Sequence, residues 1–578
     1  MDLLRFTLII DIPSAALFVR GPLTPDRLSH YVQEVIPFHA VLHSIVGHCY
    51  LCTISVHILP PRGLLTSMSW TLVIIGLSLV IYYFIDRRRQ QPLQKYPGPW
   101  LAKHTNLWRL VQSLTHSRSR PFIISQHEKY GPIVRVGPNS LSFSDPAARA
   151  DIYGSKVLLK SDFYLTAAAV SKGRATPSLF STTNIEWHKN VRGVFNKFYQ
   201  VSRFRKYMEP VMRQSIPLLI EQIGRTQEDH PYIDIAKWIQ LLTLDVMTGL
   251  TFGESFGFLE RGGDVNSVMK DSSFYHSYNQ HVGQMPWLHN LFLKNPLRCW
   301  LQRHRFLSES SNPLAIFARK HLERRAAVVG HAQSTCMLDD FLEEKRRQEV
   351  DAKSTEPQAS DTTSKTIDDN KILGMLMGNI LAGWATTSIA LTMALYFIAS
   401  DKSVYERLLE EINGVSGSIT DALPSIEDVR KMTYLDHCIM ETLRLHPPVR
   451  FSPERVVPPA SKIIAQEVIP GGTIVSVSAW VLHQNTAVFG PDVQTFNPDR
   501  WSGPEDKIRV MERNLGAFGW DEYMCIGRQL SMLEIPIALL SILRHFDVEL
   551  SRPGEAPTLA PGNTVGIKEL RVKLKRRL

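Results

Sequence analysis

The sequence predicts a mainly α-helical protein with small β-sheets and an N-terminal transmembrane anchor. Most of the chain after residue 97 carries apolar residues at helical spacing, and strand patterns are few and short. One uncharged apolar run near the N-terminus ends in a basic cluster. Of the 578 residues, 44% are hydrophobic and 21% are charged. This ordinary globular composition excludes a disordered or collagen-like chain.

Charge and cysteine content narrow the class of protein. Lys and Arg outnumber Asp and Glu by 65 to 55, and part of this surplus is clustered at Arg87–Arg89 and Lys573–Arg577. A nucleic-acid-binding chain would more often carry a dense basic stripe with aromatic residues between the charges, so we predict no nucleic-acid partner. Six cysteines in a chain of this length form no disulfide framework. We therefore expect reduced thiols in a cytosolic environment.

The first element with a membrane signature is a predicted transmembrane helix at residues 67–86. Its centre, Met68–Ile85, contains no formal charge and would measure about 27 Å as a helix, close to the hydrocarbon thickness of a bilayer. Asp86–Arg89 follows directly, and the positive-inside rule places this end on the cytoplasmic side. The abrupt basic stop argues against a buried core helix. Membrane lipid is therefore an expected partner.

Two further segments surround this helix. Residues 1–66 form an N-terminal extension, which is longer than a single anchor needs. Within it, residues 35–59 carry no formal charge, and they form either a second membrane segment or an interfacial one. Residues 87–96 are basic and contain proline, which cannot extend a helix, so they are expected to act as a hinge.

Residues 97–578 are predicted to form one large domain. A hairpin is expected where 133–136 and 140–143 flank Gly137-Pro138-Asn139. Residues 351–369 are polar and rich in Ser and Thr, which is typical of a solvated surface loop. Strand patterns return near 473–477 and towards the C-terminus. The main helical patterns cover 201–223, 233–251, 372–400, 404–415 and 426–445.

A cysteine in the segment Phe518–Gly527 is the strongest candidate for chemistry. Cys525 follows a turn and precedes an apolar helix pattern, where the helix N-terminus and nearby N–H groups favour a thiolate. A thiolate is also the axial ligand that makes haem iron push electron density towards O–O cleavage. An inert core thiol is the commoner role of a cytosolic cysteine, so this segment alone decides nothing.

Three further patterns precede this cysteine. Glu441 and Arg444 lie on one helix face, at a spacing that allows an ion pair. Arg500, in Pro498–Trp501, could join them. In Ala382–Thr387, a glycine stands beside two adjacent threonines inside a long apolar helix. Such a glycine either weakens the helix beside a small ligand, kinks it, or permits close packing.

Together and in this order, these patterns resemble the cytochrome P450 family, over residues 97–578. Pro97–Pro99 is similar to the family's proline-rich hinge, and Phe518, Gly519, Cys525 and Gly527 match its haem-ligand signature. The resemblance implies the cytochrome P450 fold, a haem-thiolate catalytic domain, and haem b with its iron as cofactor. In style the chain resembles fungal pisatin-demethylase-like enzymes, many of which act in secondary metabolism.

The resemblance also implies a role for each matching residue. Cys525 would be the metal ligand, with Phe518 and Gly527 holding the cofactor. Glu441, Arg444 and Arg500 would form a structural charge network. His188, Arg192 and Arg455 would bind the haem propionates, with Trp187 as an alternative to His188 one position away. Thr386 and Thr387 would be the catalytic hydroxyl groups.

The chain departs from the family pattern at two sites. The acid that usually precedes the threonine is Ala385, so proton delivery is expected to use Thr386, Thr387 and water, or a group of the substrate. In the haem signature, Asp521 replaces a glycine and Tyr523 replaces an arginine. A tyrosine offers one propionate only a neutral hydrogen bond.

Three functions follow from the resemblance. The first is a monooxygenase that oxidises a hydrophobic secondary-metabolite intermediate at the endoplasmic reticulum membrane, using O₂ and electrons from NADPH through a separate cytochrome P450 reductase. The second is a haem-thiolate enzyme with atypical chemistry: rearrangement, coupling or peroxide-driven oxidation. The third is a non-catalytic haem-binding membrane protein. The positions expected to line the substrate site are Met375, Met377, Asn379, Val449 and Phe451, with parts of 167–181 and 563–567.

Overall fold

The structure is a computed structural model that describes most of the chain after residue 90. The described residues are 91–116, 120–154, 158–307, 313–328, 334–354, 366–416 and 423–577. Contacts between Cα atoms divide the chain into two units, Met1–Lys95 and Tyr96–Leu578. The expected transmembrane helix at 67–86 and the segment at 35–59 lie outside the described residues. The α-helices and strands of the described residues all belong to the second unit.

The largest sheet of this unit has five strands in the order β1-β2-β10-β7-β3. The expected hairpin is confirmed, with β1 at Ile133–Gly137 paired antiparallel to β2 at Ser140–Phe143. β10 (Ile474–Val477) pairs in parallel with β2 and antiparallel with β7 (Arg455–Val456). β3 (Leu159–Lys160) closes the edge, and Lys160 is the direct cross-strand partner of Arg455.

The remaining sheets are small. β11 pairs with β14, which pairs with β6, and the other strands form two-stranded ribbons. Their bounds are β4 Ala169–Ser171, β5 Arg174–Thr176, β6 Ile233–Asp234, β8 Lys462–Ile464, β9 Glu467–Ile469, β11 Phe546–Leu550, β12 Thr558–Leu559, β13 Ile567–Glu569 and β14 Arg571–Arg576. The strands predicted near 473–477 and at the C-terminus are thus confirmed.

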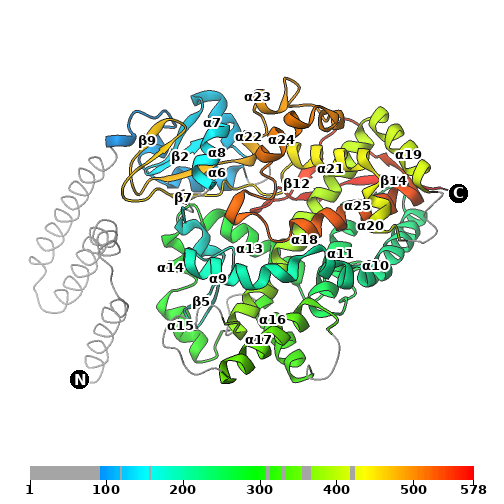
Figure 1. Ribbon diagram of the computed structural model, residues 1–578, viewed down its shortest axis with the longest axis horizontal. Coiled ribbons are helices and arrows are strands. Elements are labelled where there is room, and N and C mark those ends of the chain that lie inside the picture. The colour runs from blue at the N-terminus through cyan, green and yellow to red at the C-terminus, as the bar shows by residue number, and fades with distance from the viewer. Residues whose placement is uncertain are drawn as a thin grey trace, which may run out of the picture. The chain divides into compact units, whose positions relative to one another are not determined.

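Helices make up most of the unit, and the five-stranded sheet lies at one end of it (Figure 1). The α-helices are α6 Leu107–Thr115, α7 Ile123–Tyr130, α8 Pro146–Tyr153, α9 Ile185–Phe195, α10 Val201–Asp229, α11 Ile235–Phe252, α12 Phe258–Arg261, α13 Val268–Val282, α14 Trp287–Phe292, α15 Pro296–Arg303, α16 Pro313–Val328, α17 Met337–Ser354, α18 Asp369–Ser400, α19 Lys402–Ser416, α20 Ile426–Arg430, α21 Thr433–Leu445, α22 Ala479–Leu482, α23 Thr486–Phe489, α24 Glu505–Asn514 and α25 Arg528–His545. The mainly helical fold with small sheets is therefore confirmed.

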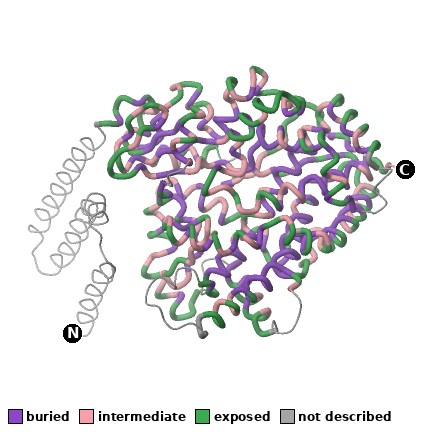
Figure 2. Tube along the Cα trace, in the orientation of Figure 1, coloured by how far each residue is buried: buried purple, intermediate pink, exposed green. Residues whose placement is uncertain are grey.

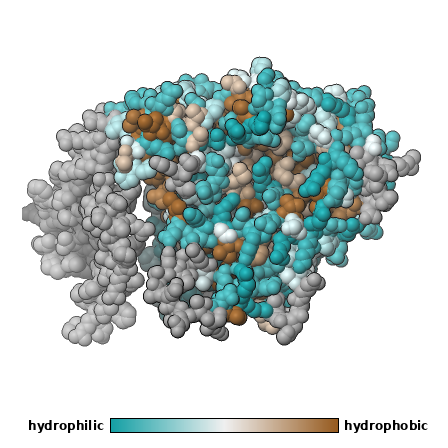
Figure 3. Space-filling view, in the orientation of Figure 1, coloured by the Kyte–Doolittle hydropathy of each residue, from teal (hydrophilic) through white to brown (hydrophobic). Residues whose placement is uncertain are grey.

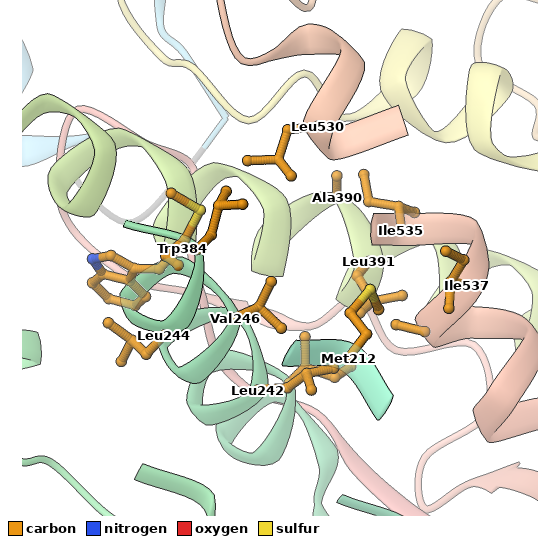
Figure 4. Packing of buried hydrophobic residues seen from close by; sticks show 14 of the residues in the cluster. Met212, Leu242, Leu244, Val246, Trp384, Ala390, Leu391, Leu530, Ile535 and Ile537 are labelled. Carbon is orange, nitrogen blue, oxygen red and sulfur yellow. The ribbon is translucent and has the colours of Figure 1, made fainter. Parts of the chain in front are cut away.

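The hydrophobic core lies where α10, α11, α18 and α25 meet. Met212, Leu242, Leu391 and Ile537 come from these four helices and pack together (Figure 4). Buried residues run through the middle of the unit, and exposed residues follow its outer helices (Figure 2). A Cβ atom on Gly383 would lie 2.6 Å from the sulfur of Met247, so this glycine permits close packing of α18 on α11.

Two expectations about the helices need correction, and one alternative left open by the sequence is decided. The pattern at 426–445 forms two helices, α20 and α21, because Lys431 and Met432 lie between them. The polar segment at 351–369 is not a loop throughout, since α17 continues to Ser354 and α18 begins at Asp369. α18 runs without a break through Ala382–Thr387, so the glycine there serves packing and the helix continues.

α18 has the length and hydropathy of a membrane-spanning helix. Within its most apolar window, 67% of the residues are buried inside the protein. Because a core helix passes the same test of length and composition, α18 is explained by its place among α11, α21 and α25. Among the described residues it is the one helix that meets the test.

Candidate active site

The candidate cysteine lies on the loop that leads into α25. The backbone N–H of Cys525 donates to the carbonyl of Phe518 at 2.8 Å, which folds the loop back on itself. Gly527 caps the helix that begins at Arg528. Burial raises the pKa of the Cys525 thiol, while hydrogen bonds from the backbone N–H groups of Gly527 and Arg528 and the charge of Arg192 lower it. The effect of burial is the larger one and leaves the pKa raised; the N–H donors and Arg192 are the groups that would support a thiolate once a cation binds it.

The side chain of Cys525 has accessible surface. The protein nevertheless surrounds it, since burial raises the pKa of its thiol. Cys525 therefore faces a space inside the protein. A second open surface occurs on α18, where Gly378, Ala382 and Thr386 are more exposed than the buried residues beside them. Their spacing of four residues places them on one face of the helix. A Cβ atom on Gly378 would meet no atom within 4 Å, which also indicates open space.

Four basic side chains converge near this loop. Lys160 and Arg455 are 6% and 3% exposed, His188 is 6% exposed, and Arg192 is partly buried. Their proximity is evident from the pKa of His188, which falls to about 3 because of burial and then because of the charges of Lys160, Arg192 and Arg455. Cations gathered in a buried place need an anion to compensate them.

No carboxylate of the described residues forms an ion pair with Lys160, Arg192 or Arg455. Glu454, next to Arg455, forms its ion pair with Arg109 instead. Glu522 raises the pKa of Arg192 through its charge, but the two side chains make no direct ion pair. The cationic group is therefore prepared for an anion that the described residues do not supply.

His188, and not its alternative Trp187, lies beside the other residues of the cationic group. Its ring lies 4.6 Å from the ring of Tyr523 and is buried, whereas Trp187 packs against the hydrophobic core. Tyr523 also lies beside the guanidinium of Arg455, at 4.3 Å from its ring centroid. The structure thus brings His188, Arg192, Arg455 and Tyr523 together.

The three residues expected to form a charge network do so. Arg444 donates to both carboxylate oxygens of Glu441, from Nε at 2.8 Å and from Nη2 at 2.7 Å, and both residues are 0% exposed. Arg500 donates from Nε to Glu441 Oε1 at 3.3 Å. The indole of Trp501 and the backbone N–H of Asn497 complete the hydrogen bonds of the carboxylate. A buried carboxylate satisfied in this way fixes the arrangement of its surroundings.

Sequence reasoning missed His483, which connects this network to the cysteine loop. Its Nδ1 lies 2.8 Å from the carbonyl of Arg444, and its Nε2 accepts a hydrogen bond from the backbone N–H of Gly516 at 2.9 Å. These bonds assign the proton to Nδ1. Burial and then the charge of Arg444 lower the pKa of His483 to about 3.

The two adjacent threonines of α18 face different surroundings. Thr386 is partly exposed, and its hydroxyl donates to the carbonyl of Ala382 at 2.8 Å. Thr387 is 2% exposed, and its hydroxyl lies 3.1 Å from the hydroxyl of Ser531 on α25. The structure therefore brings Thr386, and not Thr387, to the open face. Ala385, where the family usually has an acid, is buried.

Asp521 occupies a backbone conformation that explains why the family signature has a glycine there. Its φ is +49°, in the left-handed region where a Cβ atom is disfavoured. Aspartate tolerates this region better than most residues. An ion pair with Arg149, at 3.7 Å, accompanies the substitution.

These observations fit a haem group. A thiol with hydrogen-bond donors around its sulfur, an open face on α18, and buried cations that no described carboxylate pairs with match an iron porphyrin with two carboxylates. Groups of three or more His, Cys, Asp or Glu suited to a bare metal ion are absent from the described residues.

A separate pocket lies between α6, the β1–β2 hairpin, α13 and the segment after α21. Its volume is about 730 Å³, which includes the open solvent at its mouth. Phe163 and Phe451 form an apolar wall, and Gln280 and Asn563 bring polar groups. Gln280 Oε1 and Asn563 Oδ1 are buried and accept no hydrogen bond from the described residues.

The structure brings only part of the expected substrate-lining set to this pocket. Phe451 and Asn563 line it. Met375 and Met377 are each 5% exposed and belong to the hydrophobic core, while Asn379 accepts a hydrogen bond from the hydroxyl of Tyr199 at 2.5 Å. The last three are therefore packing residues. Phe451 also contacts Tyr164 and Phe180, which adjoin the cationic group.

Comparisons with known proteins agree with this site. The model of the family named Cytochrome P450 matches residues 97–576. The fold and the site define a haem-thiolate oxidoreductase. The chain belongs to the cytochrome P450 family, whose members bind haem, and it is a monooxygenase of that family.

Individual relatives extend over most of the chain. A cytochrome P450 monooxygenase of Aspergillus terreus (strain NIH 2624 / FGSC A1156) is 32% identical over 482 residues, which cover 82% of this chain and 94% of that protein. Cytochrome P450 monooxygenase cicH of Emericella nidulans is 30% identical over 477 residues, 82% of this chain and 91% of that protein. Cytochrome P450 monooxygenase pkfB of the same species is 28% identical over 495 residues, with 85% and 93% covered.

Proposed function

We propose that this monooxygenase oxidises a hydrophobic small molecule, an intermediate of secondary metabolism, with O₂ and electrons from NADPH. The observation that carries the proposal is the enclosed space at Cys525, with a buried cationic group nearby and an open face on α18. When bound, haem supplies the iron centre at which O₂ is activated and one oxygen atom reaches the substrate.

In this proposal the chain holds the cofactor at several points. Cys525 is the thiolate ligand of the iron, and Phe518 and Gly527 fix its loop and the start of α25. His188, Arg192 and Arg455 face the two haem carboxylates, where charge-assisted hydrogen bonds are strongest. Glu441, Arg444 and Arg500 hold the surrounding segments in place; they do not touch the reacting atoms.

Thr386 is the proposed catalytic hydroxyl. It is partly exposed on the open face of α18, where it can hold a water molecule and pass on a proton. Thr387 is directed towards Ser531, so we assign it a packing role. Because Ala385 offers no carboxylate, the proton must come through water or from a polar group of the substrate.

The proposed substrate has a hydrophobic body and at least one hydrogen-bond donor. The aromatic residues Phe163 and Phe451 suit an apolar ring system. The unpaired oxygens of Gln280 and Asn563 suit a hydroxyl or N–H group, because a buried acceptor without a donor is unfavourable. A partly oxygenated terpenoid, polyketide or alkaloid has this character.

A second candidate function is supported by the surroundings of Thr386. Ala385 stands in the position of the acid, and the hydroxyl of Thr387 is bonded to Ser531. Of these neighbouring positions on α18, Thr386 is the one that provides an accessible hydroxyl. Such a site is suited to chemistry that needs less proton delivery, such as a rearrangement, a coupling or a peroxide-driven oxidation. The third function expected from the sequence, haem binding without catalysis, is not favoured, because the relatives are named monooxygenases.

The proposed partners are an NADPH-cytochrome P450 reductase and membrane lipid, with the catalytic domain on the cytosolic side of the endoplasmic reticulum. The uncharged run Met68–Ile85 and the basic residues after it support the membrane location. Exposed apolar side chains add to this support. Ile463 and Val468 are 63% and 60% exposed on β8 and β9, and Figure 3 shows apolar surface gathered at that end of the unit.

The experiment that tests this function compares the metabolites of the host with and without the gene. A compound that accumulates in the deletion strain is then incubated with the full-length protein in microsomes, its reductase, NADPH and ¹⁸O₂. We expect a product that contains one ¹⁸O atom and needs both NADPH and reductase. Conversion with peroxide alone would favour the second candidate. An unchanged metabolite profile, with no oxygen incorporated, would overturn the proposal.

A further inference from the structure

A buried lysine, Lys160, lies beside Tyr523. Tyr523 stands where the haem signature has an arginine. The ammonium group of Lys160 lies 4.8 Å from the centroid of the Tyr523 ring. The two residues are 363 positions apart in the sequence by their numbers, and no motif connects them.

Lys160 is held in place by the sheet and by two carbonyl groups. It is the cross-strand partner of Arg455 in the β3–β7 pair, so the two residues extend from the sheet side by side. Its Nζ donates to the carbonyls of Leu179 at 2.7 Å and Phe180 at 2.9 Å. An ammonium group has three N–H donors, so one remains for a further acceptor.

Among the residues that the structure describes, no carboxylate forms an ion pair with the buried ammonium group of Lys160. It is 6% exposed, and its neighbours Arg455 and Arg192 are also cations. Burial and then these two charges hold its pKa well below the ordinary value. The two tyrosine rings at 4.8 Å and 5.0 Å offer only weak compensation. An anion close to Lys160, Arg455 and Arg192 would relieve all three.

We propose that Lys160 binds a haem propionate and so replaces the arginine that Tyr523 displaced. This inference rests on the proposed haem-thiolate site. Lys160 is a cofactor-binding residue here, with its third N–H directed to a propionate oxygen, while Tyr523 packs between His188 and Arg455. In the family signature this positive charge belongs to the cysteine loop, whereas here it belongs to Lys160 on β3, the edge strand of the sheet.

The test measures how firmly the full-length holoprotein holds haem. Haem content is determined as the pyridine haemochrome, and the rate of haem loss is followed with excess apomyoglobin as acceptor. We expect Lys160→Met to speed haem loss about tenfold or more, since a charge-assisted hydrogen bond is lost. Lys189→Met, an exposed lysine on α9, is the matched control and leaves the rate unchanged.

A rescue variant separates propionate binding from a structural role. Lys160→Met combined with Tyr523→Arg restores the arginine of the signature, and we expect haem retention within about twofold of the original. The resonance Raman band of the propionate bend should shift in Lys160→Met and return in the double variant. Either an unchanged rate of haem loss in Lys160→Met, or a folded double variant that loses haem as fast as the single variant, would overturn the proposal.

The wild-type protein distinguishes this failure from failure of the haem-thiolate site. If its reduced, carbon-monoxide-bound form lacks the red-shifted Soret band of thiolate ligation, the site itself is wrong. If that band is present while Lys160→Met loses haem at the original rate, only the role of Lys160 is wrong. Should Lys160→Met not fold, Lys160→Gln takes its place, because it keeps N–H donors for the carbonyls of Leu179 and Phe180 and removes only the charge. The same faster haem loss is expected, and an unchanged rate would overturn the proposal.

Discussion

His483 and Arg444 join the buried charge network to the cysteine loop. Nδ1 of His483 donates to the carbonyl of Arg444 at 2.8 Å, and the opposite ring nitrogen accepts from the N–H of Gly516. Arg444 itself is fixed by Glu441 through two hydrogen bonds. The position of the loop that carries Cys525 therefore depends on the imidazole of His483.

Removal of this imidazole is expected to destabilise the fold and weaken haem retention. His483→Leu leaves the N–H of Gly516 without an acceptor in a buried place, and we expect a loss of about 2–4 kcal/mol in the free energy of unfolding. Urea unfolding followed by circular dichroism measures this change. His230→Leu, at an exposed position, should change stability by less than about 0.5 kcal/mol. Equal effects of the two variants would refute the structural role of His483.

Acid sensitivity follows from buried neutral histidines. His483 has a pKa of about 3 and His446 a pKa of about 4, both lowered from 6.5 chiefly by burial. Below pH 6.5 both histidines become protonated in the unfolded chain, but they stay neutral in the folded protein. Their contribution to the free energy of unfolding is therefore complete above pH 6.5 and is lost as the pH falls towards 4. Each group contributes a slope of up to about 1.4 kcal/mol per pH unit.

The measurement is the free energy of unfolding at a series of pH values between 7 and 4. His446→Gln should reduce the slope by one proton, because that group no longer titrates. The hydrogen bond of His446 to the carbonyl of Val565, at 2.9 Å, can be retained by the amide of glutamine. A stability that stays constant from pH 7 to pH 4 would show that these histidines are not held neutral.

Thr386 and Thr387 should differ in kind when each hydroxyl is removed. Thr386→Ala takes away the accessible hydroxyl of the open face, and we expect the share of NADPH electrons released as hydrogen peroxide to rise severalfold, with normal stability. Thr387→Val keeps the shape but breaks the contact with Ser531, so it should lower stability by about 1 kcal/mol and leave peroxide release unchanged. The reverse pattern would show that the catalytic hydroxyl belongs to Thr387.

Asp521→Gly is expected to stabilise the protein. The residue has a φ of +49°, where glycine avoids the steric cost of a side chain. Loss of the ion pair with Arg149 is a small opposing effect, because Asp521 is 43% exposed. We expect a net gain of about 0.5 kcal/mol in urea unfolding. Asp506→Gly, in the first turn of α24, should instead destabilise by a similar amount; a loss in both variants would contradict the argument.

Sequence reasoning reached the parts of the site that lie close together in the chain. The cysteine loop, the Glu441–Arg444 pair and the main helices follow from short patterns, and the structure contains them at or near the expected bounds. The ambiguity between Trp187 and His188 concerns neighbours on one helix turn, where an error of one residue rotates the side chain by about 100°. In the structure, the ring of His188 is the one that packs against Tyr523.

Residues brought together by the tertiary fold could not be found in this way. Lys160 belongs to no motif, and only its register opposite Arg455 reveals its place among the cations. His483 is a lone histidine in the sequence, and its two hydrogen bonds depend on segments 39 and 33 residues away. Thr386 and Thr387 look alike in the sequence. Their roles differ because α18 is oriented so that Thr387 contacts Ser531 on α25.

The most direct test of the central claim is the carbon-monoxide difference spectrum of the reduced full-length protein. Ligation of haem iron by Cys525 predicts the red-shifted Soret band of a thiolate-ligated haem in the wild type and its loss in Cys525→Ala. Cys299→Ala, which changes a cysteine outside the site, should keep the band. A wild-type spectrum without that band, or a Cys525→Ala spectrum that retains it, would contradict the assignment of Cys525 as the haem ligand.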